Sequence, residues 1–174
     1  MNYSKLLCVA AALSAAAGEW SKPVEIRHDD ALAMTYRAMY DGSNVIVAVK
    51  IEPGWHTFSM DNKTRQDAAL KGKKSLGVEK PTTIEVAGLG LTGPWRQTEP
   101  KDFSKPELRW FSWGFEQSAL FAAPAQPNGP GPAIVTVKGQ ACSDSVCKNV
   151  TVTLETPLTG PSPAVSLSGL TALQ

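Results

Sequence analysis

Apolar and polar residues alternate along much of the chain, and this period of two predicts strands rather than helices. The clearest alternating segments are 33–40, 45–51 and the two halves of 133–155. The first two are separated by the strong turn signal Asp41-Gly42-Ser43-Asn44, which predicts a hairpin. Shorter strands are expected at 24–26, 55–59, 82–86 and 117–123.

Three stretches lack a regular period and are expected to connect the strands. Residues 61–80 are polar and basic, which is typical of a solvated loop. Residues 90–115 are irregular and rich in aromatic side chains, as in a packed or functional loop. Residues 124–132, PAQPNGPGP, predict a turn or linker.

Composition supports one all-β domain. A chain of 174 residues with 43% hydrophobic and 19% charged residues can bury a substantial core. Thirteen Pro and fourteen Gly residues indicate many turns, which favours an all-β fold. The net charge of +1 gives no reason to expect nucleic acid or an anionic membrane surface as a partner.

Both ends of the chain differ from the middle. In 1–17, Lys5 precedes an apolar run that ends at small residues, which predicts a secretory signal peptide. The run is too short to span a bilayer, and an ordinary N-terminal helix is the alternative. Cys8 would be removed with the peptide. The mature domain is expected at 18–158, and the Pro-, Ser- and Gly-rich segment 159–174 is expected to be a flexible tail.

Two cysteines lie in a predicted turn between the two halves of 133–155. Small and polar residues separate Cys142 from Cys147, and a chain reversal there would place them side by side. A disulfide needs Cα atoms about 4.4–6.8 Å apart, which facing hairpin positions can provide. Closing so small a loop would add only roughly 2 kcal/mol to stability, and a short accessible pair is suited to thiol exchange. A static bridge, a redox pair and a metal site remain open.

The metal hypothesis would need further soft ligands. His56, Met60, Met34 and Met39 could join the two cysteines around Cu(I), although their positions have no metal-ligand spacing. The sequence contains no C-x-x-C, no G-x-S-x-G, no phosphate loop and no zinc-protease signature. Neither a cofactor nor a resident metal is therefore expected.

The run 140–147, QACSDSVC, between two strands rich in Val and Thr, resembles the N-terminal periplasmic domain of the thiol:disulfide interchange protein DsbD and the related disulfide bond corrector domains. The segment 54–58, GWHTF, strengthens the resemblance, because the family has an aromatic-rich strand that starts with Gly at this place. The resemblance covers roughly 33–158. It implies an immunoglobulin-like β-sandwich with the cysteines on a hairpin.

The resemblance also implies a function in periplasmic thiol-disulfide exchange, as a component of a protein-disulfide reductase system such as that of cytochrome c maturation. Electrons would pass from a membrane-embedded thiol reductant to thioredoxin-like or other disulfide-bonded proteins, with the domain acting as a monomer. Cys147 would attack the target disulfide first, and Cys142 would be the resolving thiol. The competing hypothesis is an immunoglobulin-like interaction module whose disulfide never turns over.

A cap over the cysteines is implied by the same resemblance. Asp102 and Phe103 match the acidic residue and the aromatic residue of the family's cap, although Glu99 or Glu107 could replace Asp102. Trp55 and Phe58 would belong to the partner-binding surface, or else serve as ordinary core residues. Two departures from the family concern partner choice more than redox chemistry. Gly139 stands where an aromatic residue is common, and residues 148–150 replace a Pro-Pro pair.

Overall fold

The computed structural model describes residues 19–74, 77, 79–159 and 163–173. The predicted signal peptide, 1–17, lies outside the described residues and stays a prediction. The strands are β1 (Val24–His28), β2 (Ala31–Tyr40), β3 (Asn44–Ile51), β4 (Thr57–Phe58), β5 (Thr83–Ala87), β6 (Leu89–Leu91), β7 (Arg96–Gln97), β8 (Lys101–Asp102), β9 (Trp113–Phe115), β10 (Ser118–Pro127), β11 (Ala133–Cys142), β12 (Cys147–Thr156) and β13 (Thr171–Ala172). The helical elements are α1 (Asn62–Leu70) and the 3-10 turn η1 (Pro106–Leu108).

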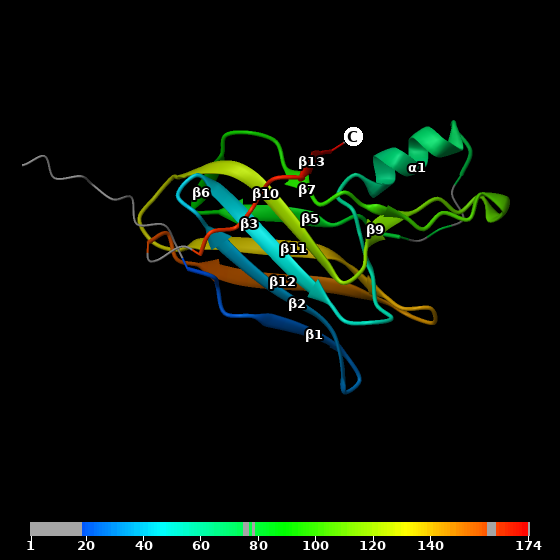
Figure 1. Cartoon of the computed structure of the whole chain (residues 1–174), viewed down its shortest axis with the longest axis horizontal. Coiled ribbons are helices and arrows are strands. Elements are labelled where there is room, and N and C mark those ends of the chain that lie inside the picture. Colours follow the sequence, from blue (N-terminus) through cyan, green and yellow to red (C-terminus); the bar gives the residue numbers. More distant parts are fainter. Residues whose placement is uncertain (1–18, 75–76, 78, 160–162, 174) are drawn as a thin grey trace, which may run out of the picture.

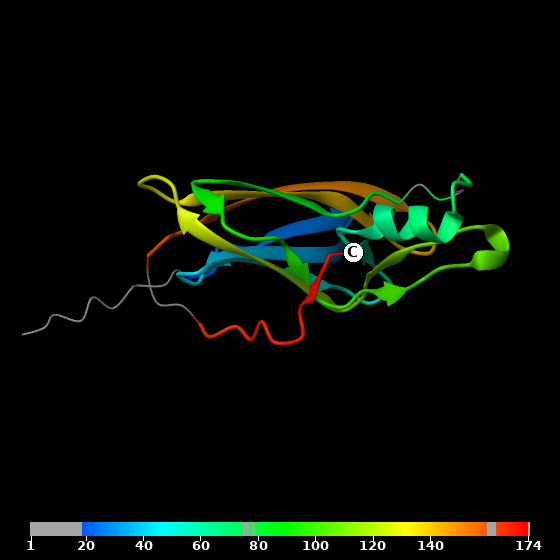
Figure 2. The ribbon, with the colours of Figure 1, turned by 90° about the horizontal axis from the view of Figure 1, so that it is seen from above.

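Two antiparallel sheets pack face to face (Figures 1 and 2). The larger sheet has the order β1-β2-β3-β10-β7-β13, with β6 also paired to β10, and the smaller has the order β12-β11-β5. In Figure 2 the β11–β12 hairpin lies above β2 and β3. This arrangement confirms the predicted all-β, immunoglobulin-like sandwich.

The core between the sheets follows the alternation read from the sequence. Every second residue of β3, β11 and β12 points inward, and burial of such side chains contributes about 1.5–3 kcal/mol each. The inward-facing residues of these strands include Val45, Val47, Val49, Val135, Val137, Val150, Val152 and Leu154.

Two long hairpins confirm the sequence prediction. The β2–β3 turn is closed by Asp41, whose Oδ1 accepts hydrogen bonds from the backbone N–H groups of Ser43 (2.8 Å) and Asn44 (2.6 Å). The β11–β12 hairpin pairs without a break from Ala133 opposite Thr156 to Cys142 opposite Cys147. Its regular register brings the two cysteines to the end of the hairpin.

Residues 61–80 differ from the prediction, because part of this segment forms helix α1 rather than a solvated loop. The buried face of α1 is largely polar, so no apolar stripe marks it. Asn62 Oδ1 accepts a hydrogen bond from the Trp113 N–H (2.8 Å), and Gln66 Nε2 donates to the Phe111 carbonyl (2.8 Å). Before the helix, Asp61 Oδ1 accepts from Gln97 Nε2 (2.8 Å). Side-chain-to-backbone bonds therefore fasten α1 to the segment 101–115.

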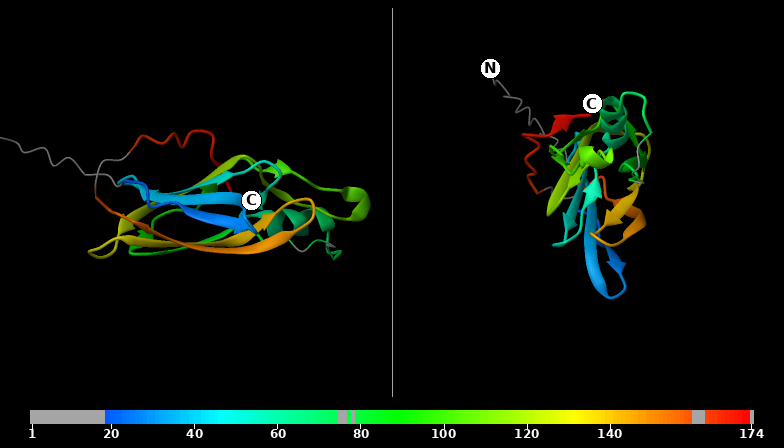
Figure 3. Two further views of the ribbon diagram at one scale, coloured as in Figure 1. Left: turned by 90° about the horizontal axis from the view of Figure 1, so that it is seen from below. Right: turned by 90° about the vertical axis from the view of Figure 1, so that its right-hand side faces the viewer.

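The aromatic stretch 90–115 is more regular than its sequence predicts. Its second part, 101–115, is a hairpin in which β8 pairs with β9, and β9 also pairs with β4. We refer to residues 101–115 as the cap hairpin. It projects at the same end of the molecule as α1 and the tip of the β11–β12 hairpin (Figures 1 and 3).

Strand β10 continues through part of the predicted linker. It pairs with β3 as far as Pro124 and with β6 from Ala125 to Pro127. A proline cannot donate to a ladder, and here each proline sits at the end of a paired segment.

The C-terminal segment also differs from the prediction of a flexible tail. Residues 163–173 run along the outer face of the larger sheet, as the red segment in Figure 2 shows, and β13 pairs with β7. Leu170 is buried against three outward-facing side chains of the sheet, Met39, Ile46 and Ala122. The Pro, Ser and Gly content of the segment does not predict this packing, because only its few spaced apolar residues contact the sheet.

Candidate functional site

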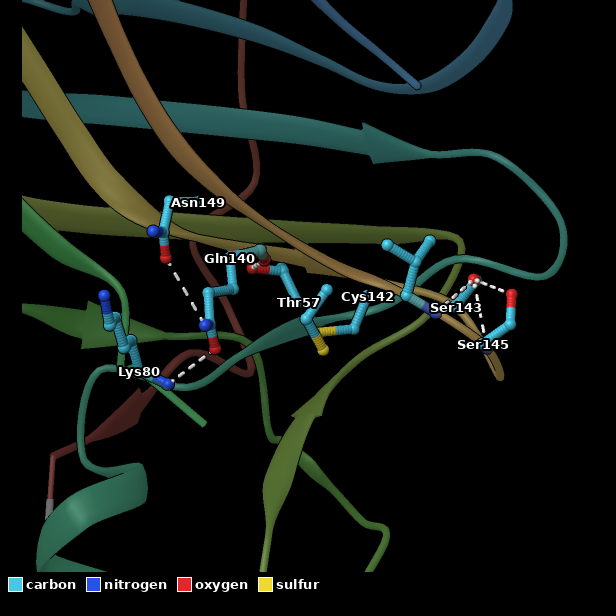
Figure 4. The surroundings of a disulfide bond; sticks show 9 residues. Thr57, Lys80, Gln140, Cys142, Ser143, Ser145 and Asn149 are labelled. Carbon is cyan, nitrogen blue, oxygen red and sulfur yellow. Dashed lines mark hydrogen bonds between the residues drawn. A yellow bond between two sulfur atoms is a disulfide. The ribbon is translucent and has the colours of Figure 1, made fainter. Parts of the chain in front are cut away.

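The two cysteines form a disulfide at the end of the β11–β12 hairpin. The Cα atoms of Cys142 and Cys147 are 4.1 Å apart, and their sulfurs are bonded at 2.06 Å. The turn between them is closed by a hydrogen bond from the Ser143 N–H to the Val146 carbonyl (2.8 Å). Figure 4 shows the Cys142–Cys147 disulfide and the polar side chains around it. A disulfide is what both the static bridge and the redox pair require, so both of these alternatives fit the structure.

Cys142 is paired on its other side with His56 of the segment leading into β4. The His56 N–H donates to the Cys142 carbonyl, and the Cys142 N–H donates to the His56 carbonyl, both at 2.9 Å. Because these backbone groups point toward His56, Cys142 faces Cys147 as a non-hydrogen-bonded pair, the closer kind of cross-strand pair. Directly opposite residues carry their side chains on the same face. His56, Cys142 and Cys147 therefore form a row across three adjacent segments.

This row lies on the outer face of the smaller sheet. Val137 and Ala141 point into the core, so Cys142 points away from it, toward the cap hairpin. Next to it on this outer face, Gln140 Oε1 accepts a hydrogen bond from the Lys80 N–H (2.8 Å), as Figure 4 shows. Cys142 is fully buried, whereas Cys147 is exposed. The two sulfur-bearing residues thus differ sharply in access to solvent.

A cavity of about 580 Å³ adjoins the disulfide. Its walls come from the cysteine turn, the segment around β4, the cap hairpin and the segment that follows α1. The lining residues outside the cysteine turn are His56, Phe58, Glu79, Phe103, Lys105, Trp110, Ser112 and Glu116. The disulfide is therefore reachable from outside the core.

Two aromatic rings contact His56 in this cavity. The His56 ring centroid lies 5.4 Å from that of Phe58 and 5.4 Å from that of Phe103. The backbone N–H of Phe103 donates to the Ser112 carbonyl (2.9 Å), which fixes Phe103 within the cap hairpin. At the rim, Trp110 is 37% exposed and lies under the Lys105 ammonium at 5.1 Å.

The structure brings some predicted site residues to the cysteines and places others elsewhere. Phe103 and Phe58 line the cavity. Asp102 is exposed, and its Oδ1 accepts a hydrogen bond from the Ser104 N–H (2.8 Å). Trp55 packs against the core and contacts His28, with ring centroids 5.8 Å apart. Among the described residues that line the cavity, neither Asp102 nor Trp55 is found.

Glu99 and Glu107, the alternatives for Asp102, are both exposed. The carboxylates that do line the cavity are those of Glu79, Glu116 and Asp144. Glu116 Oε2 accepts a hydrogen bond from Lys101 Nζ (2.7 Å). Acidic groups therefore line the cavity from segments other than the one that the sequence indicates.

The sequence names His56 only as a possible Cu(I) ligand and does not predict its backbone pairing with Cys142. Burial lowers the pKa of its imidazole below the ordinary value, and the negative charges of Glu116 and Asp144 act in the opposite direction. His56 and Phe58, two residues apart, lie on one face, with ring centroids 5.4 Å apart. The pairing of His56 with Cys142 joins segments far apart in the chain, so no local sequence pattern predicts it.

Glu79 is a half-buried carboxyl of the cavity wall. Burial raises its pKa, and a hydrogen bond from Gln66 Nε2 (3.2 Å) partly offsets this effect. Its Oε1 is buried and has no hydrogen-bond partner among the described residues. The ionised form of Glu79 is therefore less favourable in the folded protein than in the unfolded chain.

We expect Glu79→Gln to stabilise the protein at pH 7. A raised folded-state pKa means that the folded protein binds the proton more tightly, so stability falls as pH rises through the ordinary glutamate pKa. The increase in unfolding free energy should be at most about 1 kcal/mol, because solvent screens a half-exposed group. This increase should vanish below about pH 4, where Glu79 is protonated in both states. Denaturant unfolding at both pH values measures it, with exposed Glu85→Gln as the control. Destabilisation by Glu79→Gln at pH 7 would contradict this account.

Of the further ligands in the Cu(I) hypothesis, His56 lies beside the disulfide, but none of the three methionines is among the described residues that line its cavity. Met34 and Met39 are fully buried in the two apolar clusters, and Met60 packs against the larger cluster. Within the part of the chain that the structure describes, no group of three or more His, Cys, Asp or Glu side chains could hold a metal ion. Nor does any helix in the described ranges have the length and apolar character needed to cross a membrane.

Comparison with known proteins rests on structure rather than sequence. No protein-family model matches the chain, and no curated protein matches it. The N-terminal periplasmic domain of ScsB from Proteus mirabilis superposes with a TM-score of 0.57 and 16% sequence identity, over 83% of this chain and 53% of that one. The fold is similar to that of part of the ScsB N-terminal periplasmic domain. This likeness confirms the predicted resemblance to DsbD N-terminal-like domains at the level of the fold.

The chain spans about half of the ScsB structure that it matches. Two structures of the DsbD N-terminal domain from Neisseria meningitidis also match, with lower scores. The domain in its reduced form gives a TM-score of 0.43 at 14% identity, covering 68% of this chain and 78% of that one. The domain in complex with the PilB N-terminal domain gives 0.45 at 12% identity, covering 75% and 85%.

Proposed function

We propose that this chain is a periplasmic thiol-disulfide exchange domain that passes electrons through the Cys142–Cys147 pair. One observation carries the proposal. The disulfide lies outside the sandwich core, at a hairpin tip, beside an open cavity lined by aromatic and titratable side chains. A bond whose only task was to brace the fold would need neither the cavity nor the exposed cysteine.

The unequal exposure of the two cysteines supports their assignment to different steps. The exposed Cys147, as a thiolate, attacks a disulfide of the partner, and one partner sulfur leaves as a thiolate. The buried Cys142 then attacks Cys147 within the mixed disulfide, forming the Cys142–Cys147 bond and releasing the second partner sulfur. Two electrons pass to the partner, and a membrane-embedded thiol reductant restores the two thiols.

The cap hairpin supplies the surface for partner recognition. Phe103 and Phe58 shield the cavity side of the disulfide, and the exposed side chains of Leu108 and Trp110 offer apolar contact to a thioredoxin-like or other disulfide-bonded protein. The proposed acid–base group is Asp102 by resemblance to the family. Glu116 and Asp144, which line the cavity, are the alternatives supported by position.

The reduction potential of the Cys142–Cys147 bond tests this function. We expect equilibration with defined thiol–disulfide buffers to give a potential above about −300 mV, within reach of biological reductants. A potential below that value would favour the competing hypothesis of an interaction module with a static bridge. A variant with both cysteines replaced by Ala provides the baseline for thiol quantification.

A further inference from the structure

His56 is the cross-strand neighbour of Cys142 on the side away from Cys147. Their backbones exchange two hydrogen bonds of 2.9 Å each, which makes them a directly opposed antiparallel pair. Side chains of such a pair lie on one face, with Cβ atoms about 4.5–5.5 Å apart. Cys142 therefore has Cys147 on one side and His56 on the other.

The buried position of Cys142 creates a need for a base. A thiol must lose its proton before it can attack a disulfide, and burial away from water disfavours the thiolate. The lysines around the cavity contact groups other than Cys142. Among the described residues, Lys101 pairs with Glu116, Lys105 lies over Trp110, and the nearby Lys148 donates to the Arg27 carbonyl.

The environment of His56 suits it to accept a proton. Burial lowers the pKa of the imidazole, which favours the neutral form that can accept a proton. The rings of Phe58 and Phe103 both pack against the imidazole. Two carboxylates, Glu116 and Asp144, act on it electrostatically and would stabilise the imidazolium.

We propose that His56 is the general base that activates Cys142 for the resolving step, an inference that rests on the proposed exchange function. The Cys142 thiol gives its proton to His56, and the resulting thiolate attacks the sulfur of Cys147 in the mixed disulfide. The Cys142–Cys147 bond forms while the bond from Cys147 to the partner breaks, and the partner sulfur leaves as a thiolate with the electron pair. In the reverse direction, the His56 imidazolium returns the proton to Cys142.

Stopped-flow reaction of the reduced protein with the aromatic disulfide DTNB tests this role. The first release of thionitrobenzoate reports attack by Cys147, and the second reports attack by Cys142 on the mixed disulfide. We expect His56→Gln to slow the second release about 100-fold at pH 7, a typical contribution of a general base. The first release should change by less than about twofold, because His56 pairs with Cys142 rather than with Cys147.

The pH profile separates proton transfer from a purely structural effect. In the wild-type protein, the second rate constant should rise with the fraction of neutral His56 and then become independent of pH. In His56→Gln it should keep rising about tenfold per pH unit until the thiol ionises, so the two rates converge at alkaline pH. Equal slowing at every pH, or an unchanged second release, would overturn the proposal.

One control variant and two further outcomes of the wild-type protein complete the experiment. His28→Gln removes a histidine that packs on Trp55 outside the cavity, and it should leave both releases unchanged. If His56→Gln fails to fold, the wild-type profile decides alone, since a rise without a plateau contradicts a histidine base. A wild-type protein that never gives the second release would instead contradict the exchange function itself.

Discussion

Cys142→Ala is expected to accumulate covalent complexes with oxidised partners, because Cys147 can still attack but no thiol remains to release the product. Cys147 is the exposed member of the pair, whereas Cys142 is fully buried. Turnover should be abolished while the mixed disulfide persists. Non-reducing gels and mass spectrometry of a periplasmic pull-down would measure the complexes, which must disappear on reduction.

Cys147→Ala is the matched control, since it leaves only the buried thiol. We expect it to trap no partner and to support no turnover. Complexes formed by Cys147→Ala but not by Cys142→Ala would reverse the two roles. If neither variant trapped a partner, the disulfide would be a static clip at the end of its hairpin.

Gly114→Ala is expected to detach the cap hairpin from the strand that follows His56. Gly114 of β9 pairs with Phe58 of β4, and a Cβ at this position would lie 2.1 Å from the Thr57 carbonyl oxygen. Both sides of this contact are backbone, so no side-chain rotation can relieve it and the strands must separate. We expect a loss of about 3 kcal/mol in unfolding free energy, at the upper end for overpacking.

Separation of these strands should also uncover the disulfide. The rate at which dithiothreitol reduces the Cys142–Cys147 bond is expected to rise about tenfold in Gly114→Ala, the rate equivalent of about 1.4 kcal/mol of lost shielding. Gly90→Ala in β6 is the control, because the nearest atom to its new Cβ is the Gln126 oxygen at 4.0 Å. Unchanged stability and reduction rate in Gly114→Ala would show that the cap hairpin does not depend on this close contact.

The parts of the fold that the sequence predicts are those built from local periodicity. The alternation in 45–51 and in the two halves of 133–155 reflects one face of each strand packing into the core. The proximity of the two cysteines is also predictable from local sequence, because the turn and both strands of their hairpin are contiguous in the chain. Phe103 was located through the family resemblance, and the structure places it in the cavity.

The remaining features depend on contacts that no local pattern encodes. Helix α1 has a polar buried face, with Asn62 and Gln66 bonded to the backbone of the cap hairpin, so the apolar period that marks most helices is absent. The pairing of His56 with Cys142 and that of β4 with β9 connect distant segments. Asp102 follows the family's sequence pattern, yet carboxylates from three other segments reach the cavity.

The docked C-terminal segment bears on how the protein can be handled. A polypeptide cut after residue 158 would uncover Met39, Ile46 and Ala122 and would free one edge of β7. Bare strand edges beside apolar side chains invite self-association. An affinity tag or fusion partner is therefore better joined beyond residue 174 than at the boundary that composition suggests, so that the last strand keeps its place.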